Sequence, residues 1–372
     1  MLLLEEFEKY ITENELFTHN DKLLLTVSGG VDSMVMMALT AAAGYRFGVA
    51  HCNFQLRGKE SDEDEVLVEQ EARRYGVEFY NKRFDTTGEM ERTGESMEMA
   101  ARRLRYQWFK ELCEEHGYTA IVIAHHGNDS IETFFINLLR GTGLRGLTGI
   151  STQVGHIVRP MMFATRKVIH DYAVAHRIPY REDSSNRSTK YLRNKVRLGV
   201  VPMFKDIKPQ FTTIMRRNIA RLSQAQDFIT SAIDIVKGET MEHSGDVHTL
   251  CVDRIRPTLP RHYVIYEILN SEFGFKGDVV DALCRALDAE LSGRRFYSRD
   301  WVAITDRGRV VVEPIKDDDD CEVIVERNTL RSYAGGAALY YEYCDIDFID
   351  SLDQGDNVAL LDADKLQFPL RL

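Results

Sequence analysis

The hexapeptide Ser28-Gly-Gly-Val-Asp-Ser33 carries the strongest chemical signal in the chain. It follows an apolar run directly and opens a segment with helical character. Two glycines let the backbone approach a ligand closely, and successive N–H groups at a helix start bind phosphate. A Walker loop would end in Gly-Lys-Ser/Thr, which is absent, whereas Asp32 could hold a divalent cation beside the phosphates. The alternative is a tight turn with Ser33 as its cap. The predicted phosphate-binding residues are Ser28, Gly29, Gly30, Val31, Asp32 and Ser33.

A second polar group, His125-His-Gly-Asn-Asp-Ser-Ile-Glu132, follows the apolar run 119–124. Asp129 and Glu132 are three residues apart, so they share one face of the first helical turn, where the helix dipole favours carboxylates. A carboxylate there could also bind the amine of a substrate. The alternative is a capped helix with a structural histidine pair.

A third group, Arg193, Asn194 and Arg197, recurs at helical spacing and forms one polar face. Arginine suits bidentate contact with phosphate. Asp183-Ser-Ser-Asn186, just before it, is typical of a turn. The alternative for the arginine group is a solvated helix face.

Apolar runs alternate with amphipathic segments through the first half of the chain. This alternation predicts an α/β fold with a Rossmann-like parallel sheet, whose ligands bind beyond the carboxyl ends of the strands. The predicted strands are 21–27, 45–51, 77–84 and 119–124, and the predicted helices are 33–43, 61–75, 96–116 and 129–139. We assign 1–205 to this catalytic domain.

After Pro202 the strand signal stops, and the pattern predicts a smaller, mainly helical α+β domain over 206–315. Its predicted elements are helices 212–237, 262–273 and 279–291 and a hairpin over 294–312. Asp317 to Asp320 is more typical of a solvated loop than of a metal site.

Charge is distributed unevenly over the 372 residues. The net charge is −11, yet residues 140–221 hold 17 Lys and Arg against four Asp and Glu. Such segregation lets one face bind a nucleic acid. The alternative is a basic stretch dispersed around the fold. No apolar run is long enough to span a membrane, and six scattered cysteines indicate reduced thiols in a cytoplasmic protein.

The hexapeptide resembles the PP-loop of the N-type ATP pyrophosphatases, which cleave ATP between the α and β phosphates. Together, the segments from Lys22 to Arg197 closely resemble the bacterial tRNA(Ile)-lysidine synthetases. The resemblance implies ATP and Mg²⁺ as cofactors, with Asp32 near the metal. It implies free L-lysine and tRNA(Ile) with a CAU anticodon as substrates. The wobble cytidine would be adenylated, and lysine would then displace AMP at carbon 2.

The same resemblance implies roles for further residues. Glu98, Arg102 and Arg105 match a helix that faces the active site. His125 and Asp129 match positions near lysine and the activated cytidine, and Arg193 and Arg197 match an arginine pair near the leaving group. The predicted catalytic residues are Arg105, His125, Asp129, Arg193 and Arg197, and the predicted substrate-binding residues are Glu98, Arg102, Glu132 and Asn194.

Some features depart from the family or stay open. Asn128 stands where many members have an acid, and Ser130 where many have Gln. Residues 316–372 resemble a linker and the beginning of an incomplete C-terminal domain. The oligomeric state stays open, with a homodimer as one option. The alternatives are a PP-loop tRNA cytidine 2-thiolase, which needs Cys-x-x-Cys spacing that is absent here, and a non-catalytic nucleotide- or RNA-binding protein. An amidotransferase-type synthetase would need a glutaminase domain.

Overall fold

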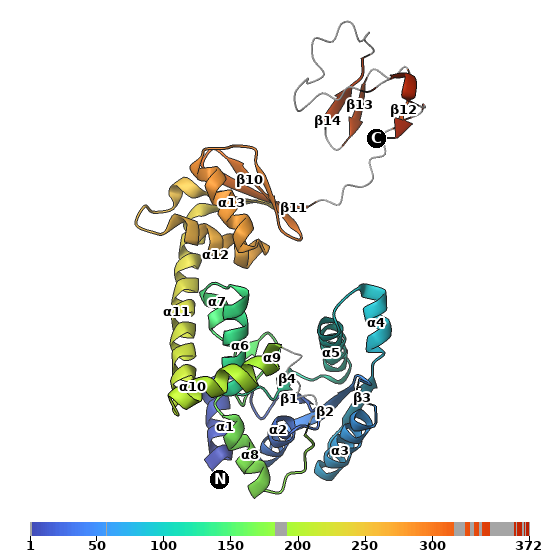
Figure 1. The fold of residues 1–372 in the computed structure, drawn as a ribbon, viewed down its shortest axis with the longest axis vertical. Helices are drawn as coiled ribbons and strands as arrows, with labels where there is room; N and C mark the ends of the chain where they lie inside the picture. Colours follow the sequence, from blue (N-terminus) through green and yellow to red (C-terminus); the bar gives the residue numbers. More distant parts are fainter. Residues whose placement is uncertain are drawn as a thin grey trace. The chain divides into compact units, whose positions relative to one another are not determined.

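The computed structural model describes residues 2–56, 58–182 and 192–315, and beyond these 324–327, 331–334, 337–342, 361, 363–366, 368 and 370–371. The chain divides into two compact units, Met1–Thr230 and Ser231–Leu372 (Figure 1). The predicted turn at 183–186 and the acidic run 317–320 lie outside the described residues. The predicted domain boundaries at 205/206 and 315/316 stay predictions.

The first unit is built on a six-stranded sheet with the order β3-β2-β1-β4-β6-β5. All neighbouring pairs are parallel except β5 with β6. The strands are β1 (Lys22–Thr26), β2 (Arg46–Asn53), β3 (Phe79–Arg83), β4 (Ala120–Ile123), β5 (Gln153–Val154) and β6 (Ile157–Val158). The predicted parallel α/β fold is therefore confirmed.

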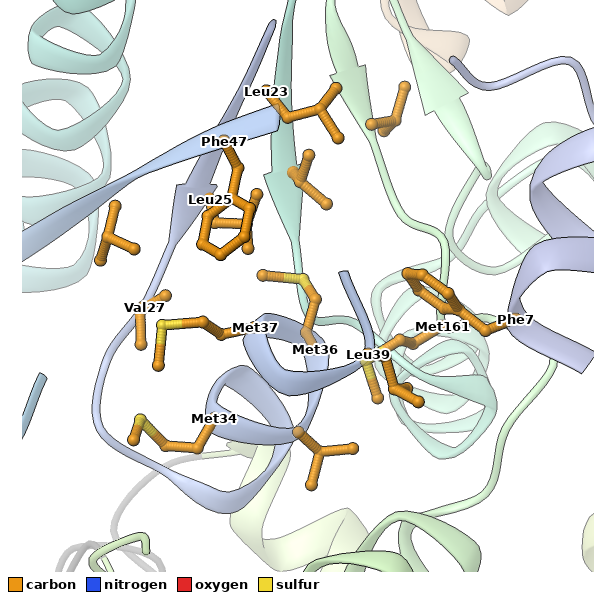
Figure 2. Close-up of a cluster of buried hydrophobic side chains, with 14 of the residues drawn as sticks. Phe7, Leu23, Leu25, Val27, Met34, Met36, Met37, Leu39, Phe47 and Met161 are labelled. Carbon is orange, nitrogen blue, oxygen red and sulfur yellow. The ribbon is translucent and has the colours of Figure 1, made fainter. Parts of the chain in front are cut away.

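Helices cover both faces of this sheet. They are α1 (Leu2–Glu13), α2 (Val31–Ala42), α3 (Lys59–Tyr75), α4 (Thr86–Thr93), α5 (Met97–His116), α6 (Gly127–Arg140), α7 (Leu144–Leu147) and α8 (Arg166–Ala175). Side chains alternate across a strand. Leu23 and Leu25 of β1 accordingly pack with α2, whereas Leu24 between them packs with Trp108 and Phe109 of α5. Figure 2 shows the α2 side, where methionines of that helix lie against Leu25 and Val27.

Strand order reverses between β1 and β4. From β1 the chain crosses to β2 on one side, and β4 pairs with β1 on the other. Because both strands are parallel, the loop into α2 and the loop into α6 leave the same edge of the sheet. This reversal is where open α/β sheets bind ligands.

An interrupted helix follows α8 in the first unit. It runs through α9 (Leu192–Lys195), a π-helical turn (Val196–Val200) and α10 (Val201–Ile207), before α11 (Phe211–Thr240) begins. Pro202 has no N–H to donate to the preceding turn, which accounts for the wide turn before it. Val196, Val201 and Phe211 pack against Ile131 and Ile136 of α6.

The second unit contains one hairpin that the sequence did not predict. It contains α12 (Arg261–Phe273), α13 (Gly277–Asp288) and a five-stranded sheet with the order β7-β8-β11-β10-β9. The strands are β7 (Met241–Ser244), β8 (Val247–Cys251), β9 (Arg295–Tyr297), β10 (Trp301–Asp306) and β11 (Arg309–Pro314). The helices and the β10–β11 hairpin were predicted, but the β7–β8 hairpin was not. Three of the four β7 residues are exposed, so the strand lacks the apolar alternation that reveals a strand.

Further along the chain the described elements are short. β12 (Ile324–Val325) pairs with β15 (Leu370–Arg371), and β13 (Arg331–Ala334) pairs with β14 (Ala337–Tyr340). Single 3₁₀ turns occur at Val252–Arg254 and Ala363–Lys365.

Candidate active site

The hexapeptide forms the loop between β1 and α2 together with the first residues of α2, an arrangement typical of phosphate-binding loops. Gly29 has a φ of +89°, which favours glycine, and Gly30 is the residue that precedes the helix. The Ser33 hydroxyl donates to the Gly30 carbonyl at 2.9 Å and accepts from the Ser28 N–H at 3.2 Å. Ser33 thus braces the loop from within and does not cap the helix. The first N–H groups of α2 are left to face a ligand, as at any helix start.

One imidazole joins this loop to the start of α6. His126 is buried, with Nε2 3.5 Å from Asp32 Oδ1 and Nδ1 3.2 Å from Asp129 Oδ2. The His126 N–H also donates to Asp129 Oδ2 at 3.0 Å. Burial lowers the pKa of His126, but the Asp32 and Asp129 carboxylates outweigh it and leave that pKa raised. The choice of His125 alone as the functional histidine therefore missed His126, although the sequence showed the pair.

The carboxylates of α6 meet the predicted arginines. Arg197 binds Glu132 with both ends of its guanidinium, Nε to Oε1 at 2.6 Å and Nη2 to Oε2 at 3.0 Å. Its Nη2 also lies 3.5 Å from Asp129 Oδ1. Arg193 Nε lies 3.7 Å from Glu132 Oε2, and its Nη2 donates to Thr133 Oγ1 at 3.2 Å. The expected shared face of Asp129 and Glu132 is confirmed.

Burial affects the two carboxyl groups differently. Burial raises the pKa of Glu132, and the Arg197 guanidinium opposes that rise. Burial also acts to raise the pKa of Asp129, but His126 and His125, a backbone N–H and Arg193 together bring that pKa below its usual range. Asp129 is therefore a carboxylate at neutral pH. Asn194, between the two arginines, is buried and Arg197 is half-buried, whereas Arg193 is exposed.

His125 has a different environment from its neighbour. Arg159 Nε donates to His125 Nδ1 at 3.1 Å, while Arg159 Nη1 donates to the Ser151 carbonyl at 2.8 Å. Burial, helped by the charges of Arg159 and Arg193 and opposed by that of Asp129, lowers the pKa of His125 to about 4. An arginine can only donate, so the neutral ring carries its proton on Nε2. Arg159 follows strand β6 directly, which is the signal that could have singled it out.

The predicted residues of α5 lie at a different part of the edge. The Arg105 guanidinium lies over the Phe54 ring at 5.1 Å, and that of Arg102 over the Tyr106 ring at 4.8 Å. Tyr106 interacts electrostatically with Arg159, and Arg159 in turn donates to His125. Glu98 is exposed in the first turn of α5. The substrate roles of Glu98, Arg102 and Arg105 stay predictions.

The two departures from the family pattern have structural partners. The Asn128 Oδ1 accepts from the Arg166 N–H at 3.1 Å, and the Ser130 Oγ accepts from the Ile150 N–H at 3.0 Å. Both side chains therefore fasten neighbouring loops to the start of α6. A pocket of about 590 Å³ opens beside this turn, with both Glu132 and Arg197 in its wall.

Within the described part of the chain, none of the helices is long and apolar enough to cross a membrane. The described cysteines Cys52, Cys113, Cys251 and Cys284 are free thiols.

Comparison with known proteins identifies both parts of the chain. Residues 3–204 match the family model of the PP-loop domain, and residues 242–315 match that of the TilS substrate binding domain. The tRNA(Ile)-lysidine synthase of Bacteroides thetaiotaomicron is 35% identical over 84% of this chain and 72% of its own length. That of Parabacteroides distasonis is 32% identical over 100% of this chain and 83% of its own length. That of Chlorobaculum tepidum is 38% identical over 65% of this chain and 75% of its own length. The chain belongs to the tRNA(Ile)-lysidine synthase family.

Proposed function

We propose that this site ligates L-lysine to carbon 2 of the wobble cytidine of tRNA(Ile) with a CAU anticodon. The cytidine O2 attacks the α-phosphorus of ATP, and the bond from that phosphorus to pyrophosphate breaks. The lysine ε-nitrogen then bonds to C2, the C2–O2 bond breaks and AMP leaves with that oxygen. The amine gives up its protons, and the product is lysidine, which decodes AUA instead of AUG. We expect the protein to act in the cytoplasm, because its substrate is a tRNA.

ATP belongs at the loop between β1 and α2. The N–H groups at the start of α2 would receive the β and γ phosphates. Asp32 fits the Mg²⁺ expected with them, because its Oδ1 is buried and makes no hydrogen bond among the described residues, with the His126 Nε2 3.5 Å away as its charged neighbour. Mg²⁺ would neutralise phosphate charge there.

Lysine belongs at Asp129. A free lysine ammonium has a pKa of ~10.4, so the attacking amine must be bound and deprotonated. Asp129 is ionised, which suits a cationic partner, whereas the Nδ1 of His125 is occupied by Arg159. Of the two predicted general bases, Asp129 is thus the better supported. His125 offers an Nε2–H donor to the departing oxygen or to the AMP phosphate.

One observation carries this proposal. The chain Asp32–His126–Asp129 joins the phosphate loop to the carboxylate that would hold lysine, over contacts of 3.5 and 3.2 Å. A site that adenylates one substrate and then lets an amine attack it must hold the phosphate loop and the amine-binding carboxylate close together. A protein that only binds a nucleotide would not need the Asp129–Glu132–Arg197 cluster.

The test uses ATP, labelled lysine and unmodified tRNA with a CAU anticodon. The wild-type protein should release AMP and pyrophosphate and place label in the RNA, and a binding protein should do neither. In Asp129→Ala, we expect lysine transfer to fall about 100-fold, and pyrophosphate release to fall less than tenfold, because only the second step uses the amine. Equal losses in both steps would remove Asp129 from the lysine site. ADP in place of AMP would overturn the reaction itself.

A further inference from the structure

A buried carboxylate outside the catalytic cluster lies against the phosphate loop. Asp64 of α3 is 6% exposed, and the Arg181 Nε donates to its Oδ1 at 2.9 Å. Arg181 also pairs with Glu63 on the exposed side of α3. A buried carboxylate is costly unless it is paired, so this ion pair holds α3 and the segment after α8 together.

The same arginine binds the loop through its backbone. The Arg181 N–H donates to the Gly29 carbonyl at 3.0 Å. In a planar trans peptide the carbonyl and the next N–H point in opposite directions. Holding the Gly29 carbonyl toward Arg181 therefore turns the Gly30 N–H away from it, toward Ser28 Oγ at 3.4 Å.

Asp64 and Gly29 also approach each other closely. A Cβ built on Gly29 would lie 3.4 Å from the Asp64 Cβ and 3.6 Å from its Cα. The loop is thus packed on Asp64 and hydrogen-bonded to Arg181, although these two residues are 117 positions apart. Neither needs to touch a nucleotide to set the direction of the loop's N–H groups.

We propose that Asp64 and Arg181 are positioning residues that hold the Gly29–Gly30 peptide in its phosphate-binding orientation. This inference rests on the proposed function only in placing ATP at the loop. Breaking the pair frees the backbone at Gly29, so ATP binding weakens while the lysine site around Asp129 is left intact.

The test measures the dissociation constant of an α,β-methylene ATP analogue, which requires no turnover. Arg181→Ala and Asp64→Ala should each weaken binding about tenfold, a size usual for contacting charged pairs. The KM for ATP should rise likewise, with less than a twofold change in the KM for lysine. The double variant should be no weaker than the worse single one, because both changes break the same contact. Glu63→Gln is the matched control, since it removes the other carboxylate on Arg181 but does not touch the loop, and it should bind normally.

Folding is checked by the thermal midpoint of each variant. Arg181 is partly exposed, so Arg181→Ala keeps the test usable if Asp64→Ala does not fold. Unchanged analogue binding in a folded Arg181→Ala protein overturns the proposal. So does a rise in the KM for lysine equal to that for ATP, or additive effects in the double variant. Absence of lysine ligation in the wild-type protein would instead contradict the proposed function, which separates the two failures.

Discussion

The contact between Arg159 and His125 leads to a prediction about the protonation of His125. The Arg159 charge helps to lower the pKa of His125, after burial, so Arg159→Gln should raise that pKa from about 4 toward the ordinary ~6.5. The wild-type ring then stays neutral through pH 5–8, whereas the variant gains a proton as the pH falls toward 5. A cationic His125 repels the lysine ammonium, so in the variant the KM for lysine should rise several-fold as the pH falls from 7 to 5.5.

The measurement is a titration of the His125 Cε1–H by NMR, with His125→Asn to identify the signal. Arg159→Lys keeps the positive charge and serves as the matched control, with a smaller rise expected. A pKa of His125 that does not move in Arg159→Gln would show that the Arg159 charge does not contribute to it.

The relative positions of residues were predictable where they depend on local spacing. The three-residue spacing of Asp129 and Glu132 placed both on one face, and the spacing of Arg193 and Arg197 placed both toward partners. Arg159 was not singled out, because it meets His125 across 34 residues and two strand ends. Such contacts depend on strand order, which no local pattern reports.

At the level of elements, the loop into α2 depends on one backbone conformation. Gly29 has a φ of +89°, and a Cβ built on it would lie 3.4 Å from the Asp64 Cβ. Gly30 has an ordinary φ of −75°, and a Cβ built on it would meet the Ser28 Oγ at 3.5 Å, an ordinary contact distance. Gly29→Ala should therefore lower the free energy of unfolding by about 1–2 kcal/mol. Gly30→Ala should change it by less than about 0.5 kcal/mol. Urea unfolding of both variants checks this, and equal losses would contradict the assigned strain.

Elements with strong periodicity or clear end signals were predictable. Helix α5 begins after Ser96, whose hydroxyl accepts from the Met99 N–H at 3.3 Å, and it ends at left-handed Gly117. Both residues mark helix ends in the sequence itself. The β7–β8 hairpin has neither strong periodicity nor clear end signals in its sequence. It is stabilised by the pairing of β8 with β11, which is distant in the sequence.

At the level of the whole chain, charge segregation gives a prediction about which part of the chain binds RNA. The basic residues 140–221 include Arg217 and Arg221, exposed and four residues apart on α11, so they present one face. Phosphate contacts release counterions, and each cation that makes one adds about one unit to the salt slope of binding. The acidic remainder of the chain would repel RNA from the rest of the surface.

Replacing both arginines, Arg217→Ala with Arg221→Ala, should therefore weaken tRNA binding about tenfold at low salt and reduce the slope of log K against log salt by about two. Binding of the ATP analogue should not change, because neither side chain belongs to the phosphate loop. Lys110→Ala, an exposed cation on α5 outside the basic region, is the control and should leave the slope unchanged. Filter binding from 50 to 200 mM salt measures all three. If the double variant keeps the salt slope of the wild type, Arg217 and Arg221 do not contact RNA phosphates. The RNA would then be bound by other cations of the 140–221 region.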